Sequence, residues 1–131
     1  NLAYQMVSEE VDKIVPNYEK ELVDYTIQRL SEFDEVVIYA KDAEHSGAVS
    51  FNLKFDGVHS SDVGMILDKK GIAVRTGHHC AQPIMHHFNI PGTVRASFAV
   101  YNTKEEMSAN LYEGNKRSLR KGFLEVEAKN I

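Results

Sequence analysis

Residues 48–55 read AVSFNLKF, in which apolar residues alternate with small or polar ones. Alternation with a period of two places every second side chain on the same side of a β-strand. The pattern therefore predicts a half-buried strand over 48–55. Its apolar side, which we expect to face a hydrophobic core, consists of Val49, Phe51, Leu53 and Phe55.

Three further segments are typical of strands. Residues 36–40 (VVIYA) are β-branched and aromatic, and they lie between polar segments. Residues 93–100 (TVRASFAV) alternate again, so that Arg95 shares a side of the predicted strand with small or polar residues. Residues 72–75 (IAVR) predict a short strand that leads into a loop at 76–81.

Two amphipathic segments in the first half of the chain favour helices. Apolar residues within 1–14 predict a short helix that Pro16 interrupts, and a stronger pattern predicts a helix from about Asn17 to Glu32. A later helix is predicted to begin at one of three N-cap candidates and to end at Gly71. The candidates are Ser60, Ser61 and Asp62, and the expected buried stripe is Val63, Ile66 and Leu67.

The second half adds a short helix opened by Pro83 and a long terminal helix that begins near Asn102. The predicted order is helix, strand, strand, helix, strand, short helix, strand, helix. This order predicts an α+β fold, with a small and mostly antiparallel sheet and helices on one face. A chain of 131 residues is the size of one domain, so we expect residues 1–131 to form a single domain.

Composition restricts the kinds of partner. A net charge of -4 argues against nucleic acid, although a local basic group occurs at Lys116, Arg117, Arg120 and Lys121. No apolar run approaches the roughly 20 residues that span a membrane. The single cysteine cannot form an intramolecular disulfide, which fits the cytoplasm. Because the sequence begins with Asn1 rather than methionine, we expect it to be part of a longer protein.

Residues 71–83, GIAVRTGHHCAQP, concentrate the groups that could carry chemistry. They contain the only cysteine, Cys80, directly preceded by His78 and His79 and, five positions earlier, by Arg75. Thiolate is the reactive form of cysteine, and a nearby Arg or protonated His stabilises it. A free cysteine can also be a small buried hydrophobe. The polar, loop-like neighbours favour a functional thiol instead.

Arg75 and Arg95 lie in or at the end of predicted strands, where a long cation is unexpected. The planar guanidinium can bind a carboxylate through two parallel hydrogen bonds. The alternative is a surface arginine on an edge strand. For Arg95, which stands between Val94 and Ala96, a half-buried carboxylate clamp is the favoured interpretation.

Histidines close to the cysteine suggest a metal site, since His86 and His87 follow closely after His78, His79 and Cys80. Contiguous residues do not easily converge on one tetrahedral ion, and neither CxxC nor HExxH spacing occurs. His86 and His87 fit an exposed helix face. We therefore expect no metal ligands.

Two blocks, RTGHHC at 75–80 and RASFAVYNTKEE at 95–106, resemble the C-terminal domain of group II (SufS-like) cysteine desulfurases, a branch of the class V aminotransferase family. The spacing between Cys80 and Arg95 agrees with that branch, and the resemblance covers nearly the whole chain. It implies the small domain of a fold-type I pyridoxal-phosphate enzyme.

The resemblance also implies a role for each candidate residue. Cys80 would attack the sulfur of L-cysteine and hold it as a persulfide while L-alanine is released. Arg95 would bind the substrate α-carboxylate with Arg75 as a second cation nearby. His78 and His79 would be supporting residues, one of which moves protons or tunes the thiol.

The cofactor of this family is pyridoxal 5′-phosphate, held by a lysine in a His-Lys motif of a large N-terminal domain. No such motif occurs in these 131 residues, so we expect the cofactor to be bound by a missing large domain and this chain alone to be inactive. The resemblance further implies a homodimer for the complete enzyme and a partner protein that accepts sulfur, for iron-sulfur clusters or other sulfur metabolism.

Two alternatives remain open at this point. One is a selenocysteine lyase or another lyase of the same family, because the arginine clamp does not discriminate between such substrates. The other is a non-catalytic sulfur-relay module that keeps the thiol loop and receives persulfide from a donor.

Overall fold

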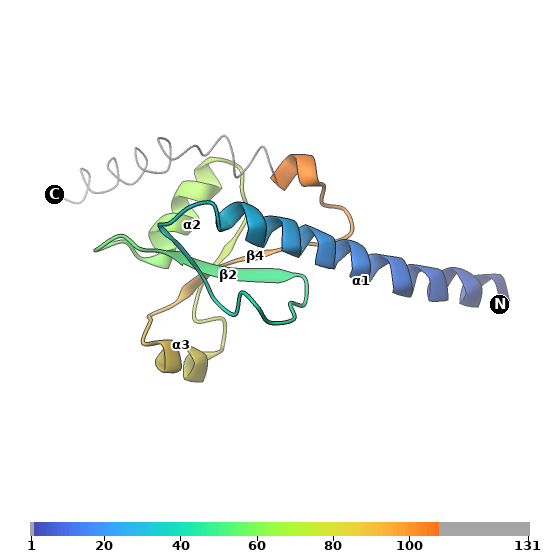
Figure 1. The fold of residues 1–131 in the computed structure, drawn as a ribbon, viewed down its shortest axis with the longest axis horizontal. Helices are drawn as coiled ribbons and strands as arrows, with labels where there is room; N and C mark the ends of the chain where they lie inside the picture. Colours follow the sequence, from blue (N-terminus) through green and yellow to red (C-terminus); the bar gives the residue numbers. More distant parts are fainter. Residues whose placement is uncertain (1, 108–131) are drawn as a thin grey trace.

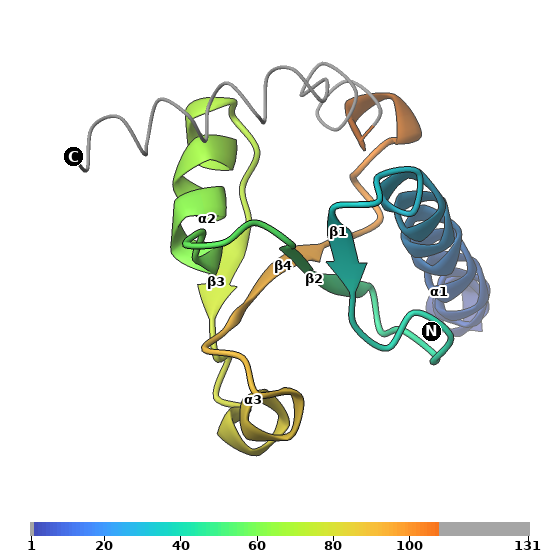
Figure 2. The same ribbon diagram turned by 60° about the vertical axis from the view of Figure 1, so that its left-hand side comes forward.

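The computed structural model describes residues 2–107. Within them, four strands form one antiparallel sheet in the order β1-β2-β4-β3, and three helices accompany it (Figures 1 and 2). In chain order the elements are α1 (Leu2–Leu30), β1 (Val36–Ile38), β2 (Ala48–Leu53), α2 (Ser60–Lys69), β3 (Arg75–Gly77), α3 (Gln82–Phe88) and β4 (Thr93–Ser97).

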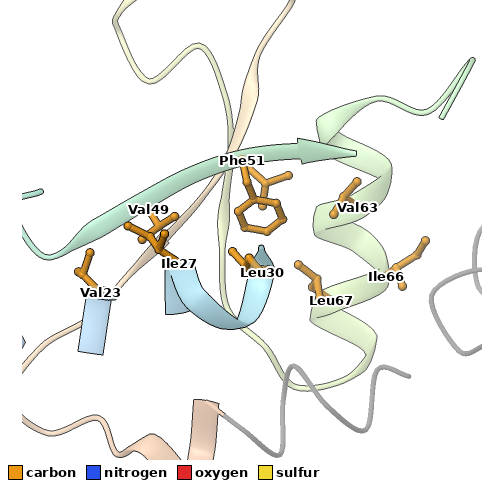
Figure 3. Close-up of a cluster of buried hydrophobic side chains, with 9 residues drawn as sticks. Val23, Ile27, Leu30, Val49, Phe51, Val63, Ile66 and Leu67 are labelled. Carbon is orange, nitrogen blue, oxygen red and sulfur yellow. The ribbon is translucent and has the colours of Figure 1, made fainter. Parts of the chain in front are cut away.

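One hydrophobic core lies between the sheet and the helices α1 and α2. From the sheet, Val49 and Phe51 of β2 and Val94 of β4 are buried. The helices contribute Val23, Ile27 and Leu30 of α1 and Val63, Ile66 and Leu67 of α2 (Figure 3). The helices α1 and α2 therefore cover the same face, whereas α3 lies apart from them, beyond the ends of β3 and β4 (Figure 2). The predicted α+β class is confirmed.

Alternation in β2 and β4 explains why one face of the sheet is apolar. Removing a valine or phenylalanine side chain from water stabilises the fold by about 1.5–3 kcal/mol. Val94 and Phe51 are paired across β4 and β2, so they present this apolar surface together. The predicted inward side of the 48–55 segment is correct, with Leu53 and Phe55 packed partly buried against the core.

The first helix differs from the prediction, because α1 runs without a break through Pro16. A proline inside a helix removes one N–H and crowds the carbonyl four residues earlier, here that of Asp12. The Asn17 side-chain amide donates a hydrogen bond to the Lys13 carbonyl at 2.9 Å, which satisfies one acceptor next to the proline. Residues around Pro16 are exposed, so water can reach the Asp12 carbonyl. The predicted helix break is therefore wrong.

The third strand also differs, since 72–75 was predicted and β3 is Arg75–Gly77. Ile72 and Val74 pack partly buried against the core without being part of the strand. Their apolar pattern indicates that the side chains are buried. A strand also requires backbone pairing with a neighbouring strand, which begins only at Arg75. The other strands lie inside their predicted ranges but end earlier, at Ile38, Leu53 and Ser97.

The later helices follow the prediction more closely. Helix α2 buries the expected stripe, but its N-cap is His59 rather than one of the three following residues. The His59 backbone N–H donates to the Asp62 carboxylate at 2.9 Å. Helix α3 has Pro83 in its first turn and ends at Asn89 in a left-handed conformation. Among the described helices, none has the length and apolar composition to cross a membrane.

A helical turn begins after Thr103, whose hydroxyl accepts the Glu106 N–H at 3.2 Å while the Glu106 carboxylate accepts the Thr103 N–H at 3.1 Å. This reciprocal pair is a capping box, as the Asn102–Glu106 sequence predicts. The rest of the predicted terminal helix, including its basic group, lies outside the described residues.

Gly92 is the position where we expect a single methyl group to disturb the fold most directly. A Cβ there would lie 2.9 Å from the carbonyl carbon and 3.0 Å from the Cα of Gly77. Backbone atoms cannot yield as a flexible side chain does, so Gly92→Ala should lower the free energy of unfolding by about 1–3 kcal/mol. Urea denaturation of the full chain would measure this loss. Ser46→Ala, at an exposed loop position, is the control and should change the value by less than about 0.5 kcal/mol.

Candidate functional site

The face of the sheet opposite the core carries the two predicted arginines. Arg95 of β4 is paired with Ser50 of β2 on one side and with Arg75 of β3 on the other. Directly paired residues of an antiparallel sheet point to the same face. Since the neighbouring Val94 points into the core, Arg75, Arg95 and Ser50 form a row on the open face.

The two arginines differ in burial. Arg95 is half-buried, and its Nε is a buried donor without a hydrogen-bond partner in the structure. Arg75 is exposed at the start of β3. Two cations paired across neighbouring strands repel each other. A negatively charged ligand would relieve this repulsion and supply the acceptor that Arg95 Nε lacks.

Cys80 lies at the tip of a tight turn. The Ala81 N–H donates to the His78 carbonyl at 2.8 Å, and the two residues between them, His79 and Cys80, have φ of 50° and 59°. Positive φ at both central positions is the pattern of a type I′ turn, which normally uses Asn and Gly. Holding non-glycine residues in this conformation costs about 1–2 kcal/mol each. The turn presents Cys80 as an exposed free thiol.

The backbone of this turn is supported by His78. The Cys80 N–H donates to His78 Nδ1 at 3.2 Å. A backbone N–H can only donate, so Nδ1 is the unprotonated nitrogen in this arrangement. The His78 ring itself is exposed.

His79 is bound differently. Its Nε2 lies 3.2 Å from the carbonyl oxygen of Thr93, the first residue of β4. Burial lowers the pKa of His79, and the charges of Arg95 and Arg75 lower it further, whereas the hydrogen bond to Thr93 opposes the shift. The balance favours a neutral imidazole. Both arginine charges therefore act on the residue next to Cys80.

Four contacts that the sequence did not suggest hold the cysteine segment against the sheet. Gly77 and Gly92 approach closely at its two ends. The Asn52 side-chain amide donates to the Gly92 carbonyl at 2.8 Å and to the Tyr39 hydroxyl at 3.3 Å. The rings of Tyr39 and Phe88 lie 5.2 Å apart, which attaches α3 to the same region. The only hint in the sequence is a polar Asn at an outward position of β2.

Two cavities in the described part of the chain differ in their relation to the site. The larger, about 650 Å³, is mainly apolar and lies among core residues such as Leu30, Phe51 and Leu67, away from the arginine row. A smaller one, about 490 Å³, adjoins the cysteine turn. Its lining consists of His78, Gln82, Met85, His86, Asn89, Ile90 and Pro91.

Metal ligands and lysines are the groups by which the described residues could hold a metal or the predicted cofactor. No three His, Cys, Asp or Glu side chains of residues 2–107 are grouped as metal ligands. Lys20 pairs with Asp24, Lys54 bonds a backbone carbonyl, and Lys104 pairs with Glu21, so these lysines are engaged elsewhere. The thiol and the arginines fit the sulfur and the carboxylate of an amino-acid substrate.

Comparison with known proteins identifies the family. Residues 1–109 match the family described as aminotransferase class-V. The chain belongs to this class V aminotransferase family. A probable cysteine desulfurase of Halalkalibacterium halodurans is 45% identical over 95 residues, which are 72% of this chain and 23% of that protein. A cysteine desulfurase of Pectobacterium atrosepticum is 44% identical over 93 residues, 71% of this chain and 22% of that protein.

Solved structures of class V aminotransferase relatives share the fold. The apo cysteine desulfurase of Thermococcus onnurineus aligns with a TM-score of 0.70 and 40% identity, over 84% of this chain and 28% of its own. The Escherichia coli cysteine desulfurase CsdA, in an S-sulfonic acid form, aligns with a TM-score of 0.68 and 32% identity, over 80% and 25%. The resemblance to cysteine desulfurases is thus confirmed. The chain spans about a quarter of the length of these relatives.

Repulsion in the arginine row can be tested through stability. Arg75→Gln removes one of two paired cations, so we expect the free energy of unfolding to rise by about 0.2–1 kcal/mol at low salt. The gain should shrink in 1 M salt, where charges are screened within about 3 Å. Lys69→Gln, an equal change in net charge at an exposed position, is the control and should show no such gain. A loss of stability in Arg75→Gln would contradict the repulsion.

The environment of His79 predicts a pH dependence. Its pKa in the folded chain is below the ordinary 6.5, so the unfolded chain binds more protons as pH falls through 6.5. The stability that comes from neutral His79 is complete above that pH and is lost below it. Substitution by Gln keeps a side-chain donor but does not titrate. The difference in unfolding free energy between wild type and His79→Gln should therefore fall from pH 7.5 to pH 5, and an unchanged difference would contradict the shift.

Proposed function

We propose that this chain is the C-terminal domain of a pyridoxal-phosphate-dependent cysteine desulfurase that converts L-cysteine to L-alanine. The observation that carries the proposal is an exposed thiol, Cys80, on a strained turn next to a residue on which the charges of Arg95 and Arg75 act. The names of the relatives support the same reaction.

The arginine row is proposed to bind the substrate α-carboxylate. Guanidinium and carboxylate form charge-assisted, paired hydrogen bonds. Arg95 is the principal group because its buried Nε lacks an acceptor, and because its place in the central part of the sheet holds it firmly. Arg75, exposed at the neighbouring position, adds a second positive charge.

Cys80 is proposed to be the nucleophile. Its thiolate forms a bond to the sulfur of L-cysteine, the carbon–sulfur bond of the substrate breaks, and the electron pair stays with the carbon, which takes up a proton and leaves in L-alanine. Cys80 is left as a persulfide. Pyridoxal 5′-phosphate, held by a domain outside this chain, would supply the electron sink for that carbon. The chain by itself would therefore not turn over.

Exposure of the thiol also bears on the fate of the sulfur. A persulfide on Cys80 would stand at the tip of a turn, where a second protein can reach it. We propose transfer to an acceptor protein, which would use the sulfur for iron-sulfur clusters or other sulfur metabolism. An exposed thiol that must remain reduced favours the cytoplasm as the setting.

The proposal can be tested by joining this chain to the cofactor domain of a cysteine desulfurase and following alanine formation from L-cysteine. Cys80→Ala should abolish alanine formation, because this chain has no other cysteine to replace the nucleophile. Arg95→Gln should raise KM about 10- to 150-fold, since a hydrogen bond to a charged group contributes about 1.5–3 kcal/mol.

The matched control is Arg29→Gln on α1, where the native arginine pairs with Glu32 and has no part in the proposed site. Its KM should equal that of the wild type. Alanine formation at the wild-type rate in Cys80→Ala would refute the nucleophile assignment. Turnover of selenocysteine alone would instead identify a selenocysteine lyase.

A further inference from the structure

We propose that the two adjacent histidines of the cysteine turn have different tasks, and that His79 is a positioning residue that ties Cys80 to the strand carrying Arg95. His78 supports the backbone of the same turn through its contact with the Cys80 N–H. The proposal rests on the desulfurase site proposed above and assigns within it what the sequence left open.

The bond from His79 defines which nitrogen holds its proton. The Thr93 carbonyl can only accept, so the proton of the 3.2 Å contact must be on His79 Nε2. Burial lowers the pKa of the ring, and the charges of Arg95 and Arg75 act in the same direction, so the neutral form is favoured. Donation of the Nε2 proton to any other group would break the bond to Thr93. Nε2 of His79 is thus engaged in a structural contact.

This contact links the two halves of the proposed site. Thr93 is two residues before Arg95 on β4, which is about 7 Å along a strand. His79 immediately precedes Cys80, so one hydrogen bond separates the nucleophile from the strand that carries the carboxylate clamp. Strand β4 is paired on both sides and is therefore a rigid reference.

The turn needs such a support because its backbone is strained. His79 and Cys80 both have positive φ, a conformation that residues with a side chain rarely adopt. Strained backbone persists only where surrounding contacts hold it. Without the bond to Thr93, the turn would relax toward ordinary conformations and the thiol would leave its position. A displacement of about 1 Å at a reacting group can lower a rate 100-fold.

His78 has the opposite arrangement. Its Nδ1 accepts the Cys80 N–H, so the proton of the neutral ring is on Nε2. The ring is exposed and borders the smaller cavity, together with Gln82 and His86. His78 therefore supports the backbone of the turn through Nδ1, and protonation of Nδ1 would break this contact.

Two substitutions of His79 separate the tether, by which we mean the hydrogen bond from His79 Nε2 to the Thr93 carbonyl, from the effect of backbone strain. The amide nitrogen of Gln reaches about as far as Nε2 and can donate to the Thr93 carbonyl, whereas that of Asn is one methylene shorter. Asn adopts positive φ more readily than Gln. If backbone strain alone determined whether the turn stays closed, His79→Asn would keep it closed better than His79→Gln. If the hydrogen bond to Thr93 determines it, His79→Gln should keep the turn closed better.

The first measurement is amide hydrogen exchange of Ala81 in the full chain, since the Ala81 N–H closes the turn. We expect exchange to be at least 10-fold faster in His79→Asn and within about 3-fold of wild type in His79→Gln. Imidazole ¹⁵N spectra should show the Nε2–H form of His79 in the wild type. Equal exchange in both variants, or an Nδ1–H form, would overturn the tether. These measurements need neither cofactor nor substrate.

The second measurement is turnover in the chain joined to a cofactor domain. His79→Asn should lower kcat about 10- to 100-fold with KM for L-cysteine within about 2-fold, because Arg95 is untouched, and His79→Gln should restore most of kcat. Equal kcat in the two variants would also overturn the assignment. If the wild type forms no alanine, the proposed function fails, while the exchange results still decide the tether.

His78 provides a control in the same turn. The Asn side-chain oxygen can replace Nδ1 as acceptor for the Cys80 N–H. His78→Asn should therefore keep Ala81 exchange within about 3-fold of wild type. Exchange as fast as in His79→Asn would show that any change in the turn loosens it, and would overturn the tether.

Discussion

Strand β4 pairs with β2 on one side and with β3 on the other, and its register places both the core and the candidate site. Consecutive residues of β4 point to opposite faces of the sheet, since Val94 is fully buried in the core and Arg95 lies on the open face. A slip of one residue would put the guanidinium among hydrophobic side chains and the valine in water. The burial of Val94 against Phe51 thus determines where Arg95 lies, although neither apolar side chain carries a reactive group.

The cysteine segment depends on the same strand in a second way. Residues 77–92 leave the sheet at the end of β3 and return at the start of β4, with the thiol on a strained turn in between. The contacts that hold this excursion, from His79 and Asn52, are made to backbone carbonyls at the start of β4 or just before it. Backbone acceptors of a paired strand move little, so the strained turn is held by the most rigid part of the fold.

The sequence predicted the parts of the fold that are governed by burial. Alternation identified Val49 and Phe51 as inward, and helical spacing identified Val63, Ile66 and Leu67. It failed where a local rule is outweighed by its surroundings, as at Pro16, where an exposed helix tolerates the lost N–H. It also misplaced β3, because Ile72 and Val74 are buried without being paired.

The candidate site shows the same division. Cys80, Arg75 and Arg95 stand out in the sequence because their residue types conflict with their apolar or loop context. The contact between His79 and Thr93 joins residues 14 apart, and no local pattern indicates it. The positive φ of His79 and Cys80 was equally hidden, since two consecutive residues other than glycine rarely share that conformation.

The close approach of Gly77 and Gly92 has a consequence for how such a protein can change. This approach holds the two ends of the segment 77–92 together, so residues can be added or lost between them without shifting the register of the sheet. The entropy of closing a loop grows slowly, by about 0.6 kcal/mol for each doubling of length. The scaffold can therefore accept insertions and deletions around the thiol as evolutionary variation, with the sheet and its arginines inherited unchanged.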